Sequence, residues 1–410
     1  MNEKYAIINA KILTAKDDGK PLKGTKQSEL NEYRHMLIEG GKIKKLTRDL
    51  EDIPECLMID CKGSLVTPGL IDPHTHLVHG GSREHEIILK LKGASYMEIH
   101  NSGGGIASTV KDTRNANYHE LKEKAMLDLK HIVSLGVTTI EAKSGYGLNF
   151  DDEIKCLKIT KELNEESEVD IINTFMGAHS IPIEFKENPD QYVKFICEKM
   201  IPHVAQKNLA DFCDVFCEQG VFDIKQSEKI LKTAKSHGLK AKIHADEIIS
   251  IGGAELAASI EATSADHLMA VSDKGIEKLS KTDVVAVLLP GTSFYLRKEY
   301  APARKLISRN VAVALATDFN PGSCPSDNMQ LIINLGYLYL RMNPKEILNA
   351  CTINAAYAVD VANKTGSLDI GKNADFIIWD SDNLEYIIYR YGKNHVKKVY
   401  KSGKMIFEVN

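Results

Sequence analysis

The chain has 410 residues, of which 43% are hydrophobic and 26% are charged, as in ordinary globular proteins, so a disordered or fibrous chain is excluded. The net charge is −4 at pH 7, which does not favour a nucleic acid as a partner, because proteins that bind nucleic acids usually carry an excess of positive charge. The first residues lack the basic and apolar segments of a signal peptide, and no apolar run approaches the roughly 20 residues of a membrane-spanning helix. We expect a soluble, cytoplasmic protein with no membrane partner.

The eight cysteines are scattered along the chain, and no two form a Cys-x-x-Cys pair. A chain of this length buries a large core without disulfides, so we expect reduced thiols, as is usual in the cytosol. Cys213 and Cys217 stand four residues apart on one face of a predicted strand, where a buried pair of small side chains explains them.

Both ends of the chain carry short apolar runs that predict β-strands. The runs are residues 5–13, 35–38 and 42–46 near the N-terminus and residues 374–379, 396–400 and 405–407 near the C-terminus. Gly40-Gly41 separates two of these runs and predicts a hairpin. We expect the two ends, residues 1–66 and 366–410, to pair into one small β-rich domain.

Between the ends, eight apolar runs separated by segments of helical character predict an α/β fold, a (β/α)8 barrel over residues 67–365. The runs are residues 65–71, 137–140, 171–176, 212–216, 241–243, 263–265, 284–289 and 311–316. Apolar residues between Leu121 and Val133 recur at helical spacing, and Gly136 is placed to end that helix. The alternative is a doubly wound sheet, but no glycine-rich phosphate-binding turn follows a predicted strand.

Two histidines follow the first barrel run directly, in Asp72-Pro73-His74-Thr75-His76. In an extended segment, residues two apart point to the same side, so His74 and His76 can offer imidazole nitrogens to one metal ion. A lone pair of this kind also arises by chance or as packed side chains. Its position favours a metal site, because active sites in these barrels lie at the carboxyl ends of the strands.

Further candidate ligands lie at the ends of other predicted strands. They are His179, His244, His267 and Asp318. Imidazoles and carboxylates buried without a shared partner would be costly, so a common metal ion is the simpler explanation. Three imidazoles with one carboxylate suit zinc or ferrous iron, and the spacing does not choose between these ions. Such an ion lowers the pKa of bound water towards about 7.

Residues 67–76 and 366–375 resemble the opening and closing signatures of the amidohydrolase superfamily. The resemblance implies a metal-dependent (β/α)8 barrel with a small β-sandwich formed by both termini. Some relatives bridge two metal ions with a carboxylated lysine on the fourth strand, but residues 212–216 contain no lysine. The resemblance therefore implies one zinc or iron ion per subunit. Its ligands would be His74, His76, His244 and Asp318.

Within this superfamily, the chain is most similar to the imidazolonepropionase family. The similarity rests on residues 79–84, 143–147, 177–179, 244–247, 264–267 and 318–323. It implies hydrolysis of the cyclic amide bond of 4-imidazolone-5-propanoate to N-formimidoyl-L-glutamate in histidine degradation. The implied partner is this small anionic substrate and not a nucleic acid, and a homodimer is the assembly to test.

The resemblance also implies roles in proton transfer. Asp318 would take a proton from the attacking water, and Glu247, which also binds the substrate, would carry a proton to the ring nitrogen. His267 would stabilise the developing oxyanion by donating a hydrogen bond. For Glu247 the alternative is a solvated residue at a helix start, and for His267 it is a purely structural histidine.

Substrate binding is expected from residues in the loops that follow the strands. Arg83 would bind the propanoate carboxylate, because a guanidinium group pairs with a carboxylate through two hydrogen bonds. A loop arginine is more often a plain surface charge, so this role depends on its place in the matching segment. The other residues expected to contact substrate are Tyr146, His179, Asn320, Gly322 and Ser323.

Two other functions remain open at this point. A purine or pyrimidine deaminase could use the same ligands and the same Glu247, but it would release ammonia, which the ring-opening reaction does not. A non-catalytic scaffold with the same barrel is the second alternative. The complete set of four candidate ligands argues against it, because a scaffold has no need to keep them.

Overall fold

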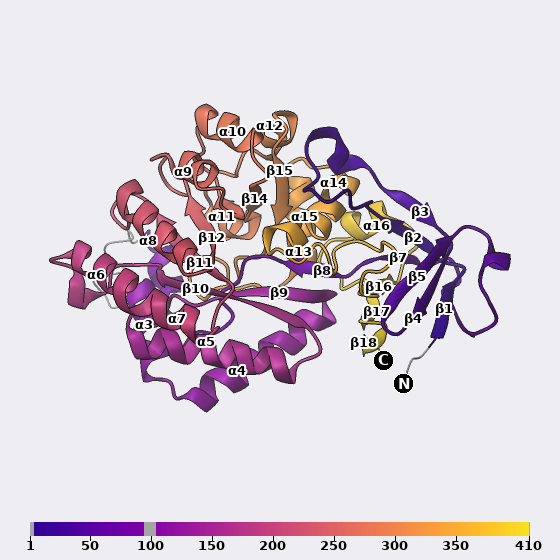
Figure 1. Cartoon of the computed structure of the whole chain (residues 1–410), viewed down its shortest axis with the longest axis horizontal. Coiled ribbons are helices and arrows are strands. Elements are labelled where there is room, and N and C mark those ends of the chain that lie inside the picture. Colours follow the sequence, from indigo (N-terminus) through magenta and orange to yellow (C-terminus); the bar gives the residue numbers. More distant parts are fainter. Residues whose placement is uncertain (1–3, 94–103, 410) are drawn as a thin grey trace.

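A computed structural model describes residues 4–93 and 104–409, and an eight-stranded sheet lies at its centre (Figure 1). In chain order its strands are β8 (Leu70–Asp72), β9 (Val137–Lys143), β10 (Asp170–Ala178), β11 (Phe212–Cys217), β12 (Lys240–Ala245), β13 (Ser264–His267), β14 (Val285–Leu288) and β15 (Ala312–Leu315). Neighbouring strands are parallel and follow one another in the chain. The sheet closes where Thr75 and Phe319, which follow the first and last strands, form a parallel bridge. The predicted (β/α)8 barrel is confirmed.

The first predicted run, residues 65–71, is divided between two sheets, whereas the other seven runs coincide with barrel strands. Strand β7 (Leu65–Pro68) pairs with β2 (Lys11–Thr14) and β16 (Phe376–Trp379) outside the barrel. Gly69 lies between β7 and β8, and a Cβ atom there would lie only 2.2 Å from the Thr138 hydroxyl oxygen. Glycine therefore lets the chain pass from one sheet to the other. The division of the chain at residues 66 and 365 stays a prediction.

Helices surround the barrel (Figure 1). Among the described residues they are α1 (Ile87–Leu91), α3 (Ile106–Asn115), α4 (Tyr118–Ser134), α5 (Phe150–Glu166), α6 (Pro189–Phe195), α7 (Ile201–Gln206), α8 (Ile224–Ser236), α9 (Gly253–Ser259), α10 (Asp273–Ser280), α11 (Pro290–Leu296), α12 (Ala303–Ser308), α13 (Met329–Leu338), α14 (Pro344–Ala350), α15 (Ile353–Ala358) and α16 (Leu384–Tyr389). Helix α4 contains the helical run predicted from Leu121 to Val133. A capping box of Asn117 and Glu120 begins it, and Gly136, with φ 98°, follows its end as predicted.

The two ends of the chain form one small domain beside the barrel, as predicted (Figure 1). A four-stranded sheet has the order β5-β4-β1-β6, and a six-stranded sheet has the order β18-β17-β16-β7-β2-β3. Besides β2, β7 and β16, the strands of these two sheets are β1 (Lys4–Ile8), β3 (Asn31–Tyr33), β4 (His35–Glu39), β5 (Lys42–Thr47), β6 (Leu57–Asp60), β17 (Val396–Lys401) and β18 (Lys404–Glu408). Gly40 and Gly41 have φ 60° and 73°, the backbone that a tight hairpin requires. Ile7, Ile38 and Phe376 are among the buried residues that join the two sheets.

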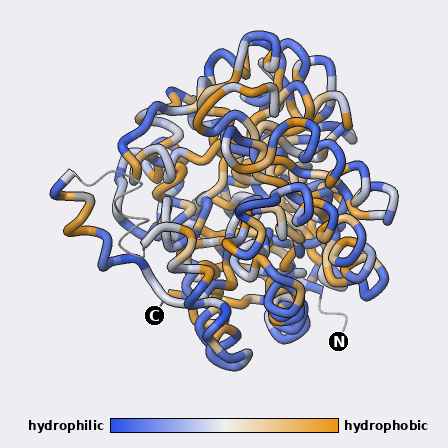
Figure 2. Tube along the Cα trace, turned by 90° about the vertical axis from the view of Figure 1, so that its left-hand side faces the viewer, coloured by the Kyte–Doolittle hydropathy of each residue, from blue (hydrophilic) through white to orange (hydrophobic). Residues whose placement is uncertain are grey.

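The main hydrophobic core lies between the barrel strands and the surrounding helices. Aliphatic residues such as Ile140 on β9, Leu129 on α4 and Ile230 on α8 are buried there. In Figure 2 the outer turns of the helices are mostly hydrophilic, whereas hydrophobic stretches lie in the interior. No helix within residues 4–93 or 104–409 is long and apolar enough to cross a membrane.

Charged side chains lie inside the barrel, just below its carboxyl-terminal end. They are Glu141 and Lys143 on β9, Asp214 on β11, Lys242 on β12 and Asp266 on β13, and all five are buried. Lys143 donates hydrogen bonds to Glu141 and Asp214, and Lys242 donates one to Glu141. Buried charges are tolerated when they are paired, and these side chains form such a paired ionic layer inside the barrel.

Candidate functional site

Five histidines and one aspartate meet at the carboxyl-terminal end of the barrel. His74 and His76 follow β8, His179 follows β10, His244 lies in β12, His267 ends β13, and Asp318 follows β15. The rings of His74 and His244 are 4.5 Å apart between centroids, and those of His244 and His267 are 4.9 Å apart. The structure therefore brings together the four predicted metal ligands and also His179 and His267.

These side chains are close enough to share a metal ion. Ligand atoms lie within 4.8 Å of one another in each of three sets: His74, His76 and Asp318; His74, His244 and His267; and His76, His179 and His244. Among the described residues, Nε2 of His74 and Nε2 of His244 are buried and have no hydrogen-bond partner. Buried imidazole nitrogens are rarely left unpaired, so this donor set fits a metal ion. Which of the histidines bind it stays a prediction.

Two buried carboxylates orient two of the candidate ligands. Nδ1 of His74 donates to Asp266 at 2.7 Å, which leaves Nε2 as the nitrogen with a free lone pair. Nδ1 of His244 lies 3.0 Å from Asp214, which also accepts the backbone N–H of His244 at 3.2 Å. A metal-binding histidine usually donates its second ring nitrogen to such a partner. His74 does so, whereas the close contact between Nδ1 of His244 and Asp214 is not aligned as a hydrogen bond.

Barrel closure places Asp318 beside the histidines that follow the first strand. The backbone N–H of Asp318 donates to the His74 carbonyl at 3.0 Å, and Asp318 Oδ1 lies 3.5 Å from Nε2 of His74 and 3.9 Å from Nε2 of His76. The Thr292 hydroxyl donates to the other carboxylate oxygen at 2.5 Å. Burial raises the pKa of Asp318 to about 6.

Backbone conformations that non-glycine residues rarely adopt cluster at these strand ends. Asp246, His267 and Asp318 have φ 49°, 74° and 55°. Such conformations cost free energy and persist where the surrounding structure imposes them, commonly at functional sites. These left-handed conformations change the direction of the chain at, or next to, the predicted site residues.

Glu247 follows β12, and its carboxylate lies 3.5 Å from Nε2 of His267. Burial, and next the negative charge of Asp318, raise the pKa of Glu247 to about 8. Its carboxyl group therefore stays largely protonated at neutral pH. By contrast, burial and the neighbouring His244 hold the pKa of His267 well below its usual value, so this ring is neutral.

Arg83 reaches the site from the loop after β8, but one edge of its guanidinium is already occupied. Its Nε and Nη2 atoms donate to Glu86 at 2.8 and 3.0 Å, and Glu86 is fully buried. A Cβ atom on Gly322 would lie 2.1 Å from Nη1, so Arg83 packs directly over the backbone of Gly322. The guanidinium thus presents Nη1 to the loop after β15, while Glu86 holds its opposite edge.

Tyr146 and His179 pack against His76, and the His179 ring also lies 6.0 Å from the His244 ring between centroids. The His179 ring stacks on His76 with centroids 4.7 Å apart, and the Tyr146 ring is 5.4 Å from His76. Nδ1 of His179 donates to the Gly145 carbonyl at 3.0 Å, which leaves Nε2 for another partner. Burial raises the pKa of the Tyr146 phenol well above its usual value, so the hydroxyl stays a hydrogen-bond donor.

The side chain of Asn320 is engaged within its own loop. Its amide nitrogen donates to the Asp318 carbonyl at 2.6 Å and to the Ser323 hydroxyl at 2.8 Å. Its oxygen accepts the backbone N–H groups of Gly322 and Ser323, both at 2.8 Å. These bonds make Asn320 a support for the loop, and direct contact of Asn320, Gly322 and Ser323 with substrate stays a prediction.

The ionic layer and Glu86 were not predicted from the sequence. Burial acts to lower the pKa of Lys143, but the charges of Asp214, Glu141 and Asp266 outweigh it and keep this side chain protonated. Burial likewise opposes ionisation of Asp214, but His244 and Lys143 hold its pKa well below its usual value. One feature of the sequence could have indicated the ionic layer: charged residues within or next to apolar strand runs are rarely buried unless they are paired.

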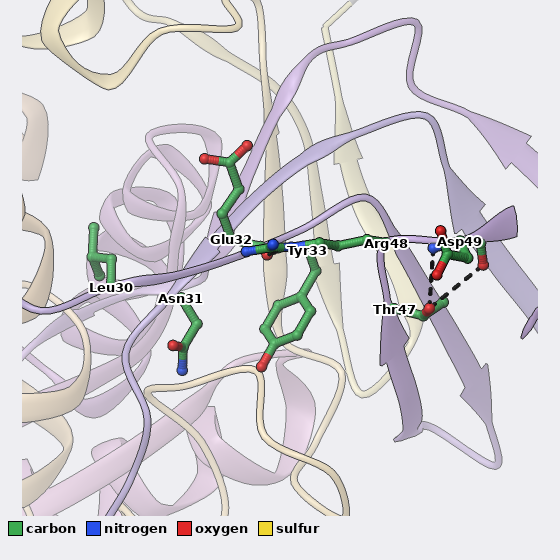
Figure 3. A pocket seen from close by; sticks show the side chains of 7 residues that line it. All are labelled: Leu30, Asn31, Glu32, Tyr33, Thr47, Arg48 and Asp49. Atoms are coloured by element: carbon green, nitrogen blue, oxygen red, sulfur yellow. Dashed lines mark hydrogen bonds between the residues drawn. The ribbon is translucent and has the colours of Figure 1, made fainter.

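One hollow lies on the small domain, away from the end of the barrel. It is lined by Leu30, Asn31, Glu32, Tyr33, Thr47, Arg48 and Asp49 (Figure 3). Its residues come from β3, β5 and the segments beside them, and the Thr47 hydroxyl is hydrogen-bonded to the Asp49 backbone. None of the predicted site residues lines this hollow, so the end of the barrel stays the candidate active site.

The chain is similar to proteins of one known family over most of its length. The chain matches the amidohydrolase family over residues 65–406. It is 49% identical over 405 residues to an imidazolonepropionase of Alkaliphilus oremlandii, which covers 97% of this chain and 96% of the relative. It is 52% identical over 396 residues to an imidazolonepropionase of Brevibacillus brevis, with 94% and 93% covered.

Solved structures of lower identity share the fold. The guanine deaminase of E. coli superposes with a TM-score of 0.76 at 15% identity and covers 100% of both chains. A 5-methylcytosine deaminase from Klebsiella pneumoniae superposes with a TM-score of 0.74 at 17% identity, covering 99% of this chain and 98% of its own. At these identities the similarity concerns the fold and not the substrate.

Proposed function

This chain belongs to the amidohydrolase family and, within it, to the imidazolonepropionases, and we propose that it hydrolyses 4-imidazolone-5-propanoate to N-formimidoyl-L-glutamate in histidine degradation. The observation that carries the proposal is the cluster of His74, His76, His244 and Asp318 with unpaired ring nitrogens, in a chain about half identical to these enzymes. Water adds across the ring amide: its oxygen bonds to the carbonyl carbon, the C–N bond breaks, and the nitrogen gains a proton.

We propose that one zinc or iron ion is bound at this cluster. The proposed ligands are His74, His76, His244 and Asp318. When bound, the ion supplies Lewis acidity, which polarises a carbonyl group and makes water a stronger acid. The hydrogen bond to Asp266 directs the free nitrogen of His74 towards the cluster and so prepares it to bind.

Two carboxyl groups would divide the proton transfers. Asp318 would accept a proton from the attacking water, since its Oδ1 faces the histidine cluster. Glu247, whose pKa of about 8 keeps it protonated, would deliver a proton to the leaving ring nitrogen. His267 would donate an N–H to the oxygen on which negative charge develops, because neither of its ring nitrogens makes a hydrogen bond within the described residues.

Substrate binding would use the residues around the cluster. Arg83 would pair with the propanoate carboxylate through the guanidinium edge that Glu86 leaves open. Tyr146 and His179 would hydrogen-bond the ring through the hydroxyl and through Nε2. The loop that Asn320 supports, with Gly322 and Ser323, would close the far side.

The test measures the loss of the imidazolone ultraviolet absorbance together with ammonia release. We expect the absorbance to disappear with no ammonia, and N-formimidoyl-L-glutamate to appear in equal amount by mass spectrometry. Ammonia release from this substrate, or turnover of guanine or cytosine with none of the imidazolone, would favour the deaminase alternative. No turnover of any ring by a metal-loaded protein would favour the scaffold.

We also propose that the protein is a cytoplasmic homodimer. Exposed aromatic and aliphatic side chains lie on α11, on α13 and the residue that follows it, and on α16: Phe294, Tyr337, Leu338, Tyr339 and Tyr389. Phe294 and Tyr339 are in ring contact, and Asn334 on α13 donates to the Ile388 carbonyl on α16, so these helices are neighbours. Apolar patches of this kind commonly mark subunit contacts. Light scattering should give twice the 45.5 kDa chain mass, and the chain mass itself would refute the dimer.

A further inference from the structure

We propose that Lys143 is a positioning residue of the metal centre: its buried ammonium group fixes the two carboxylates that orient His74 and His244. The inference rests on the proposed metal binding, but it assigns a role to a side chain that the proposed reaction does not use. It concerns how the protein holds its histidine ligands, whichever substrate is turned over.

The contacts of Lys143 match the three protons of an ammonium group. Lys143 is the last residue of β9, and its side chain is fully buried. Its Nζ atom lies 2.8 Å from Glu141, 2.8 Å from Asp214 and 3.4 Å from Asp266. One cation therefore joins carboxylates from β9, β11 and β13 in the interior of the barrel.

The oxygens that face Lys143 are the same ones that face the histidines. Oδ2 of Asp266 accepts from Nδ1 of His74 at 2.7 Å and lies 3.4 Å from Lys143. Oδ2 of Asp214 lies 3.0 Å from Nδ1 of His244 and 2.8 Å from Lys143. The ammonium group thus couples two imidazole–carboxylate pairs and holds both rings with Nε2 directed away from the ionic layer.

Two effects of removing Lys143 have opposite signs, so a measurement can separate them. Without the ammonium group the two carboxylates lose a fixed partner, the imidazoles lose their orientation, and metal affinity falls. Mutation of groups that orient metal ligands typically lowers affinity by about 10–100-fold. Conversely, deleting a positive charge near a bound cation would by itself raise affinity. Our proposal requires the first effect to exceed the second.

Lys242 offers a matched control for the loss of a buried ammonium group. It is fully buried on β12 and donates to Glu141 at 2.7 Å, to the Pro73 carbonyl at 3.2 Å and to the Ala358 carbonyl at 3.0 Å. Its hydrogen bonds thus go to Glu141 and to the backbone, not to Asp214 or Asp266. A general weakening of the barrel would affect the Lys143 and Lys242 variants alike, whereas ligand positioning would single out Lys143.

The experiment compares Lys143→Met, Lys143→Arg and Lys242→Met in the full chain. The dissociation constant for zinc is measured by competition with a chelator, and the absorption spectrum of the cobalt(II)-substituted protein reports ligand geometry. We expect Lys143→Met to weaken zinc binding about 10–100-fold and to alter the cobalt spectrum. Lys143→Arg should restore most of the affinity, and Lys242→Met should change it much less. If Lys143→Met does not fold, Lys143→Gln, which keeps an N–H donor without charge, takes its place with the same expectations.

Unchanged or tighter zinc binding in the Lys143 variant would overturn the inference, as would an equal loss in Lys242→Met. The failure of the proposed function is separate from these outcomes. Wild-type protein that binds one zinc ion but opens no imidazolone ring would refute the function, while the affinities of the variants would still decide the role of Lys143. Wild-type protein that binds no metal would overturn both.

Discussion

Replacing Arg83 by methionine removes one guanidinium that faces two anions, the buried Glu86 and the proposed substrate carboxylate. Methionine keeps much of the packing of the aliphatic stem but none of the hydrogen bonds. Nε and Nη2 of Arg83 donate to Glu86, and Nη1 lies over Gly322 at the far side of the site. We therefore expect effects on both stability and catalysis, and each can be given a magnitude.

The stability effect comes from Glu86. Its side chain is fully buried, so Arg83→Met leaves a carboxylate without the guanidinium that it pairs with at 2.8 Å. Breaking a buried ion pair by removing one partner typically costs about 3–5 kcal/mol. Arg83 is 13% exposed, which places this pair at the lower end of that range. The double variant Arg83→Met/Glu86→Gln removes the carboxylate charge together with the guanidinium, so its free energy of unfolding should return towards the wild-type value.

The catalytic effect should be the same in the single and double variants. Loss of one partner of a desolvated charge pair costs about 2–5 kcal/mol, which corresponds to about a thirty-fold to five-thousand-fold loss in kcat/KM. The assay follows imidazolone absorbance with the natural acid and with an analogue whose carboxylate is a neutral amide. Wild type should strongly prefer the acid, and both variants should lose that preference. If the double variant keeps kcat/KM within a few-fold of wild type, Arg83 does not bind the carboxylate.

Three further predictions address the metal, the proton donor and the loop. Purified protein should contain about one zinc or iron ion per chain, and His244→Ala should lose both metal and activity; a ratio near two, or a fully active variant, would contradict the single-ion site. Glu247→Gln should keep the metal but lose about 10²–10⁴-fold in kcat, because an amide cannot donate and regain a proton. Since the pKa of Glu247 is raised to about 8, its protonated, proton-donating form is lost as the pH rises, so wild-type kcat should fall above about pH 8. A kcat that does not change up to pH 10 would exclude Glu247 as the proton donor. Gly322→Ala should raise KM with little change in metal content, because its Cβ would displace the Arg83 guanidinium; an unchanged KM would show that the loop yields instead.

Patterns confined to a few neighbouring residues were sufficient to predict much of the fold. Apolar runs located the barrel strands, and the spacing between Leu121 and Val133 with Gly136 located helix α4 and its end. The alternation in a strand was enough to place His74 and His76 on one side, and their position after the first run indicated the end of the barrel where they lie. These features depend on local conformation, which a residue and its near neighbours largely control.

Contacts between distant segments were decided by the tertiary structure alone. Asp318 lies beside His74 because the first and last strands close the barrel in one register, and a shift of that register would move the carboxylate away from the cluster. Lys143 forms ion pairs with Asp214 and Asp266 on two other strands, and no local sequence pattern specifies that these side chains face each other. The register of the strands and the burial of these side chains arise from the packing of the whole chain. They determine which charges are paired and which imidazole nitrogens remain free to bind a metal ion.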